Sequence, residues 1–96
     1  MSVNQFMSAN LPTIQRIINE MPRPFDTHAF IRVFSRQFQV DYVRLLSKYP
    51  TDPFEAVHKQ IGRFLLDNKV ALGITEQGKV DSANIFGLIS DNEQWN

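Results

Sequence analysis

The five prolines of this chain all lie within its first 53 residues, and their positions limit where helices can begin and end. Proline has no backbone N–H and clashes with the preceding turn, so a helix accepts it only in its first turn. Pro12 therefore predicts the start of a helix, which Pro22 and Pro24 terminate. Pro50 closes the next helical region, and Pro53 predicts the first turn of another helix.

Between these prolines, apolar residues recur with the spacing of amphipathic helices. One apolar stripe covers residues 14–21. A second stripe begins after Asp26, a typical N-cap residue, and contains no glycine or proline. Within it, a β-branched residue is followed by Asp41, another residue suited to an N-cap. We therefore expect two helices here, over about residues 27–38 and 41–49, rather than one continuous helix.

Residues 52–55, with the sequence Asp-Pro-Phe-Glu, carry the strongest helix-start signal in the chain. The aspartate suits the N-cap, the proline suits the first turn, and the glutamate is placed to complete a capping box. We expect a helix over 53–71 that stops at Gly73. Gly62 lies inside it at a cost of up to about 1 kcal/mol relative to alanine, which predicts a close helix crossing.

The C-terminal segment changes character from helical to extended. Residues 72–86 are predicted to form a short hairpin with Gly78 in its turn. The apolar residues beyond Gly78 are too numerous for a free tail, so we expect them to pack back onto the helices. They are Ile85, Phe86, Leu88, Ile89 and Trp95.

Together these elements predict a mainly α fold, a small domain of about four helices with a C-terminal β-hairpin. The order of two helices, a turn, a longer helix and a hairpin is winged-helix-like, although layout alone does not establish function. Residues 10–96 are expected to form this single domain. Residues 1–9 are mostly small and polar, and they are predicted to be a flexible N-terminal arm.

Composition narrows the cell compartment and the class of protein that we expect. The chain has 96 residues and no cysteine, which excludes disulfides and thiolate metal sites. Its longest apolar runs are three residues, far short of the roughly 20 that a membrane span needs. The first ten residues lack the pattern of a secretory signal. We expect a soluble, cytoplasmic protein that does not engage membranes.

The formal net charge is zero, but the two halves of the chain differ. Residues 1–50 contain six basic and three acidic residues, a charge of +3, whereas residues 51–96 contain four basic and seven acidic residues, a charge of −3. A neutral chain is an unpromising non-specific nucleic-acid binder, because phosphate neutralisation drives such binding. The asymmetry predicts either one basic face or two halves that attract each other.

No motif for catalysis or metal binding is present. His28 and His58 are the only histidines, and they lack the spacing of a paired metal site. No serine lies in a Gly-x-Ser-x-Gly motif, and the four glycines form no phosphate-binding loop. We expect no enzymatic activity, no metal and no cofactor.

One group of side chains has the chemistry of a binding surface. His28, Arg32 and Arg36 are spaced by four residues, opposite the phenylalanines of their helix, and such residues commonly contact phosphates. Arg44 and Lys48 on the following helix extend this predicted basic face. The simpler interpretation is a solvated helix face, with its arginines paired to acidic residues of the second half.

The function expected from these features is that of a non-catalytic interaction module, most simply a protein–protein adaptor that binds an unidentified protein or a second copy of itself. The alternative is a winged-helix-like DNA- or RNA-binding domain. It would use either the face of His28, Arg32 and Arg36 or the 53–71 helix, where Lys59 and Arg63 are the candidate contacts.

Overall fold

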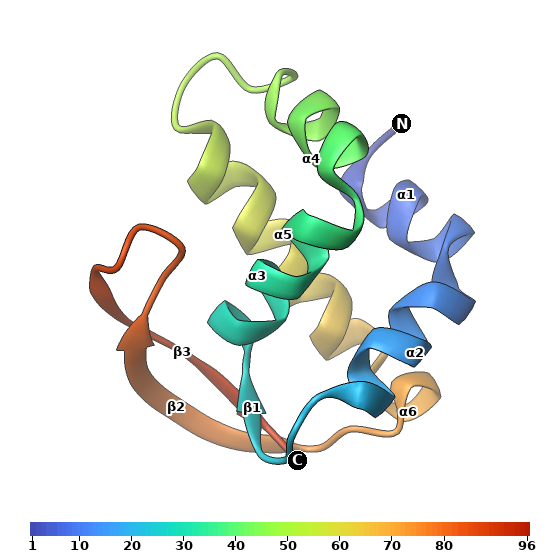
Figure 1. Cartoon of the computed structure of the whole chain (residues 1–96), viewed down its shortest axis with the longest axis vertical. Coiled ribbons are helices and arrows are strands. Elements are labelled where there is room, and N and C mark those ends of the chain that lie inside the picture. Colours follow the sequence, from blue (N-terminus) through green and yellow to red (C-terminus); the bar gives the residue numbers. More distant parts are fainter.

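The computed structural model describes all residues, 1–96, and contains six helices and a three-stranded antiparallel sheet (Figure 1). The elements in chain order are α1 (Val3–Ala9), α2 (Leu11–Glu20), β1 (Phe25–Asp26), α3 (Thr27–Gln37), α4 (Gln39–Leu46), α5 (Pro53–Asp67), α6 (Lys69–Leu72), β2 (Glu76–Ala83) and β3 (Ile89–Trp95). The predicted mainly α class is confirmed, with six helices in place of about four.

The N-terminal residues form helix α1 instead of the expected arm. Val3, Phe6 and Met7 are buried, and their spacing places them on one face of the helix. Phe6 meets Phe38 edge-on, with ring centroids 5.0 Å apart. Ser2 caps the helix through a capping box. The arm prediction was wrong because three apolar side chains are enough to dock a two-turn helix on an existing core.

The predicted break between the second and third helical segments is confirmed. Helix α3 ends at Gln37 and α4 begins at Gln39, with Phe38 between them at φ −119° and ψ 48°. Asp26 caps α3 by accepting a hydrogen bond of 2.9 Å from the backbone N–H of Ala29. Helix α4 is shorter than expected and ends at Leu46.

The long helix begins at Pro53 as predicted, but its cap is different. Asp52 lies in the left-handed region, at φ 47° and ψ 57°, and its side chain makes no capping hydrogen bond. Asp52 therefore occupies the predicted N-cap position, but the side-chain capping hydrogen bond expected of it is absent. Asn68 separates α5 from the short α6, and Gly73 ends α6 at φ 68°, as its position predicted.

The hairpin exists, but its turn is later than expected. Strand β2 passes through Gly78, which lies at an irregularity in the pairing with β3, and the connection to β3 spans residues 84–88. The Asn84 side chain organises this connection by accepting hydrogen bonds from the N–H groups of Phe86 and Leu88. Gly87 supplies the positive φ of 79° that the turn requires.

The sheet has the order β1-β3-β2, so the C-terminal strand is its centre. Phe25 pairs with Trp95 in register, and both side chains are buried in the same hydrophobic core as the helices. Figure 1 shows the sheet lying beside α3 and below α5. No helix has both the length and the apolar character needed to cross a membrane.

Candidate functional site: a cleft between helix α5 and the hairpin

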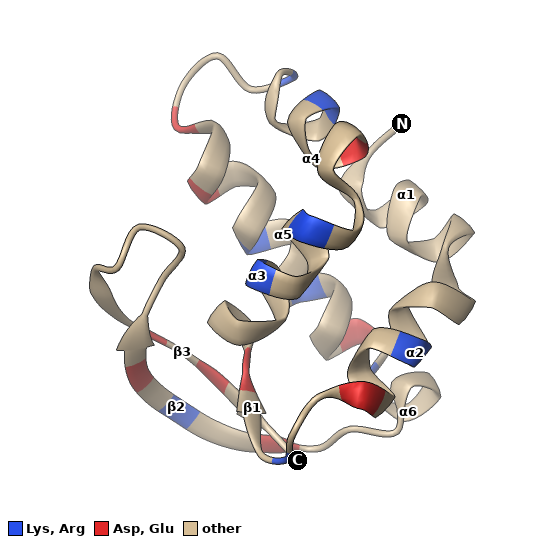
Figure 2. Cartoon of the chain, viewed as in Figure 1, with Lys and Arg blue, Asp and Glu red and all other residues tan.

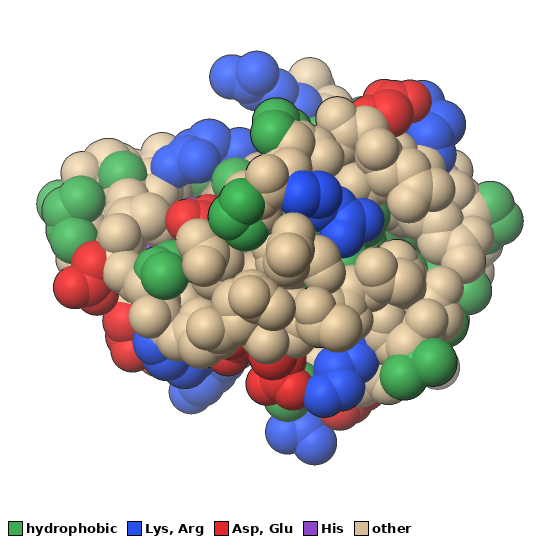
Figure 3. Space-filling view, turned by 90° about the horizontal axis from the view of Figure 1, so that it is seen from below, with side chains coloured by type: hydrophobic (Ala, Val, Ile, Leu, Met, Phe, Trp, Pro, Cys, Tyr) green, Lys and Arg blue, Asp and Glu red, His purple; other side chains and the backbone are tan.

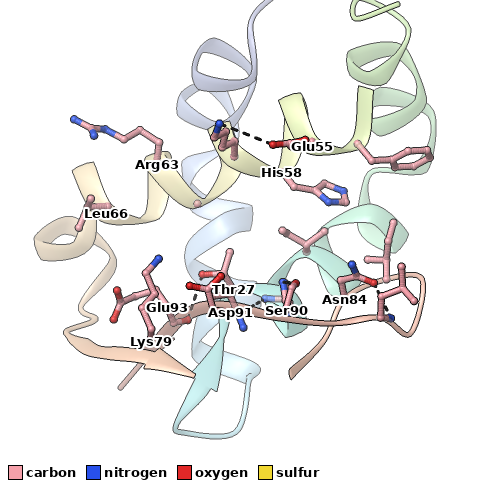
Figure 4. Close-up of a pocket in the computed structure, with 18 of the residues that line it drawn as sticks. Thr27, Glu55, His58, Arg63, Leu66, Lys79, Asn84, Ser90, Asp91 and Glu93 are labelled. Carbon is pink, nitrogen blue, oxygen red and sulfur yellow. Dashed lines mark hydrogen bonds and ion pairs between the residues drawn. The ribbon is translucent and has the colours of Figure 1, made fainter. Parts of the chain in front are cut away.

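A cleft of about 810 Å³ lies between helix α5 and the β2–β3 hairpin (Figure 4). Helix α5 forms one wall, and the strands and turn of the hairpin form the other. The first turn of α3 contributes Thr27 and His28 to the lining. In Figure 4, His58 projects from α5 toward the strand that carries Ser90 and Asp91. The cleft therefore joins segments that are far apart in the sequence.

Two side-chain contacts connect α5 and α6 to the hairpin. Near the start of α5, the rings of Phe54 and Phe86 meet edge-on with centroids 4.9 Å apart. Beyond the end of α5, Lys69 of α6 forms an ion pair of 2.6 Å with Glu76 of β2. Because one contact lies near the start of α5 and the other just beyond its end, they oppose movement of the hairpin away from this helix.

His28 links α3 to both strands of the hairpin. Its ring Nδ1 lies 3.0 Å from the Ser82 hydroxyl, and its Nε2 lies 3.4 Å from the Ser90 hydroxyl. Its backbone N–H donates to the side-chain carbonyl of Asn92, whose amide in turn donates to Ser82. Both ring nitrogens are thus engaged by hydroxyls, so this histidine has a positioning role in the fold.

His58 is held between aromatic rings on the other wall. Its Nε2 lies 2.6 Å from the Tyr42 hydroxyl, and the two rings stack with an angle of 12°. Burial lowers the pKa of His58 from 6.5 to about 4, and the nearby His28 adds to this effect. Burial also raises the pKa of Tyr42 to about 12. At neutral pH both groups are therefore uncharged.

The lining of the cleft offers both polar and apolar contacts. No group of three histidine or acidic side chains is close enough to hold a metal ion. The aromatic rings of Phe54 and Phe86 provide apolar surface at one end. The walls carry charges of both signs, including Lys79 and Asp91 of the hairpin.

The basic face predicted on α3 and α4 is not a single free patch. Arg32 donates to the backbone carbonyl of Ala83 in the hairpin, and Lys48 donates to the carbonyl of Met1. Arg44 forms an exposed ion pair of 3.5 Å with Asp41. Arg36 is exposed and makes no hydrogen bond or ion pair. His28, as described above, is committed to the hairpin.

The two basic residues predicted on α5 line the cleft but are paired along their own helix. Lys59 lies 4.0 Å from Glu55, and Arg63 lies 3.1 Å from Asp67. Figure 2 shows basic residues spread over the helices, with most of the acidic residues of the second half on α5 and the sheet. In the face seen in Figure 3, the two signs of charge are interspersed rather than gathered.

The predicted pairing of arginines with acidic residues of the second half is also absent. The four ion pairs join Arg44 to Asp41, Lys59 to Glu55, Arg63 to Asp67, and Lys69 to Glu76. Each pair lies within one half of the chain. The +3 and −3 halves therefore do not neutralise each other through direct ion pairs inside the molecule.

Sequence reasoning missed the apolar surface at the hairpin turn. Phe86, Leu88 and Ile89 were expected to pack onto the core, but they are 57, 65 and 71% exposed. Of the other apolar residues of this segment, Trp95 is buried as expected and Ile85 packs partly against the core. If the turn had been predicted at Asn84 and Gly87 instead of at Gly78, Phe86, Leu88 and Ile89 would have been placed at the end of the hairpin.

Comparison of the chain with protein-family models, with curated proteins and with solved structures gave no match.

Proposed function

We propose that the chain is a non-catalytic protein-interaction module that binds its partner through the end of the β2–β3 hairpin. The observation that carries this proposal is the segment from Ser82 to Ser90, which contains no charged residue and exposes three large apolar side chains. We call Phe86, Leu88 and Ile89 the hairpin tip. Contiguous exposed apolar surface on a small protein is typical of an interaction site.

The tip is held in one conformation before any partner binds. Asn84 fixes the turn through its two backbone hydrogen bonds, and Phe86 rests against Phe54 of α5. A preorganised loop loses less conformational entropy on binding than a mobile one. The contact with Phe54 also extends the apolar surface onto the mouth of the cleft.

Two acidic residues border the tip, and they favour a partner whose binding site is surrounded by basic residues. Asp81 and Asp91 are directly opposite each other on β2 and β3, and both are exposed. Like charges in this position repel, and a basic partner would relieve the repulsion. As a cysteine-free chain, the module is proposed to act in the cytoplasm.

The test replaces the apolar tip without disturbing the core. In the double variant Leu88→Ser and Ile89→Ser, chemical cross-linking to bound proteins should fall strongly, whereas the melting curve should stay close to wild type. Val70→Ser is the matched control, because Val70 is 89% exposed on α6 and lies outside the tip. Equal cross-linking by the tip variant and wild type would refute the role of the tip.

A second candidate function, winged-helix-like nucleic-acid binding, is favoured by the topology. Strand β1 lies between α2 and α3, and the hairpin follows α5 and the short α6. With the sheet order β1-β3-β2, this arrangement fits a winged helix with α4 and α6 as additional helices. In this proposal α5 would approach the nucleic acid, and Lys59 and Arg63 would contact phosphates.

The charges near α5 make this candidate the weaker one. Lys59 and Arg63 are paired with acidic residues, and Glu76, Asp91 and Glu93 of the facing hairpin also line the cleft. The discriminating experiment is fluorescence anisotropy with labelled duplex DNA and RNA over a range of salt. Binding that weakens steeply with salt and is lost in Lys59→Glu with Arg63→Glu would favour this candidate.

A further inference from the structure

We infer that the partner of the hairpin tip is a second copy of this chain, which receives the tip on the outer face of helix α4. This inference rests on the proposed function and names the partner. The proposed contact is head-to-tail, because each copy uses one surface to donate its tip and a different surface to receive the tip of another copy.

The receiving surface is apolar and bordered by two arginines, one of which is paired with Asp41. Val40 and Val43 are 70 and 63% exposed, and they lie one turn apart on α4. Arg44 follows Val40 by four residues, so both lie on the same face of the helix. Arg36 occupies the last turn of α3, four residues before Val40, and has no partner of its own. This surface is the chemical complement of an apolar tip bordered by Asp81 and Asp91.

Arg44, on this surface, is available for a new contact. The ion pair between Arg44 and Asp41 measures 3.5 Å and joins two well-exposed side chains. Exposed pairs of this kind are weak because water competes with both partners. An aspartate arriving with an apolar tip would meet Arg44 in a less hydrated setting, where the attraction is stronger.

The distribution of charge along the chain supports the same contact. Residues 1–50 carry +3 and residues 51–96 carry −3, and no ion pair joins the two halves within one molecule. In a head-to-tail pair, the acidic hairpin of one copy meets Arg36 and Arg44 of the next, where Asp41, the partner of Arg44, is the one acidic residue of α4. The opposite charges of the two halves of the chain are then neutralised between copies instead of within one molecule.

The two surfaces are separate on the fold, so one copy can use both at once. Figure 1 shows α4 and the hairpin turn as separate projections, with the start of α5 between them. The contact of Phe86 with Phe54 holds the tip against α5. A contact between two different surfaces is heterologous, and it extends into rings or filaments unless one surface is blocked.

The experiment blocks one surface in each of two variants and measures mass by sedimentation velocity. Leu88→Glu blocks the tip, and Val40→Glu blocks the α4 face. Val70→Glu is the matched control for introducing a glutamate at an exposed apolar position. All three sites are more than half exposed, so melting curves should remain close to wild type.

We expect wild type and Val70→Glu to associate as concentration rises and to dissociate at high salt. Each blocked variant alone should be monomeric. Their equimolar mixture should form a dimer and nothing larger, because one intact tip meets one intact α4 face and the other two surfaces are blocked. This recovery in the mixture is specific to a head-to-tail contact.

Two outcomes would overturn the inference. One is a wild-type chain that stays monomeric at about 1 mM, where even a Kd of 1 mM would give substantial association. The other is association of wild type without recovery in the mixture, which points to a tip–tip contact. If cross-linking to a different protein still depends on the tip, the proposed function stands and only this inference fails. If tip variants alter neither self-association nor cross-linking, both fail.

Discussion

The indole N–H of Trp95 donates a hydrogen bond of 2.9 Å to the hydroxyl of Thr27, and both side chains are buried. The bond joins the last strand of the sheet to the first turn of α3, 68 residues earlier in the sequence. It fixes the base of the hairpin relative to the helices. The position of the tip and the shape of the cleft therefore depend on it.

Replacing Thr27 by valine should destabilise the protein by about 1–3 kcal/mol, because the shape is kept while a buried indole N–H loses its acceptor. Urea unfolding measures the change. Thr27→Ser, which keeps the hydroxyl, is the control, and its free energy of unfolding should fall clearly less than that of Thr27→Val. Equal losses in the two variants would mean that the methyl group, rather than the hydrogen bond, is the important feature.

Gly62→Ala should stabilise the protein by about 0.5–1 kcal/mol, because glycine within a helix is disfavoured relative to alanine. A Cβ at this position would lie 3.7 Å from the Thr27 methyl group, an ordinary contact distance. Gly73→Ala is the contrasting variant, since its φ of 68° strains any residue with a side chain. The melting temperature should rise for Gly62→Ala and fall for Gly73→Ala.

The elements that sequence predicted correctly are those set by local chemistry. Prolines and apolar spacing located α2 and the start of α5. A break between α3 and α4 was also predicted, but it lies at Phe38, and Asp41 falls in the first turn of α4 instead of at its N-cap. Asp52 shows the limit of such reasoning. Its residue type suits an N-cap, but capping depends on backbone conformation, and its φ of 47° turns the side chain away from that role.

The hairpin and the cleft depend on contacts that no local pattern reveals. Gly78 and Gly87 both adopt positive φ, so residue type alone does not tell which one forms the turn. The pairing of Phe25 with Trp95, which makes β3 the central strand, joins distant parts of the sequence. Likewise, the helical spacing of Arg32 predicted a free basic face, whereas the folded chain brings Ala83 within its reach.

The caps of α3 and α5 give a direct comparison. Asp26→Ala should reduce the free energy of unfolding by about 1 kcal/mol, because it removes the hydrogen bond to the Ala29 N–H. Asp52→Asn should change it by less than about 0.5 kcal/mol, since asparagine tolerates positive φ and no capping bond is lost. Urea midpoints of the two variants check this. A loss for Asp52→Asn as large as that for Asp26→Ala would mean that the Asp52 carboxylate stabilises the protein through a contact other than a cap, because asparagine is itself a good N-cap residue.

Stability should fall as the pH decreases from about 7 toward 5, in part because of His58. Its pKa is lowered to about 4 in the folded protein, whereas the unfolded chain has the ordinary value of 6.5. Between these values the unfolded state binds more protons than the folded state, so acidification favours unfolding. The contribution of His58 is fully present above pH 6.5 and is lost as the pH falls toward 4.

The measurement compares urea midpoints at pH 7.5 and pH 5 for wild type and His58→Gln. The variant removes the titrating ring next to Tyr42, so its midpoint should depend less on pH than that of wild type. Parallel midpoints for the two proteins would assign the pH dependence to other groups.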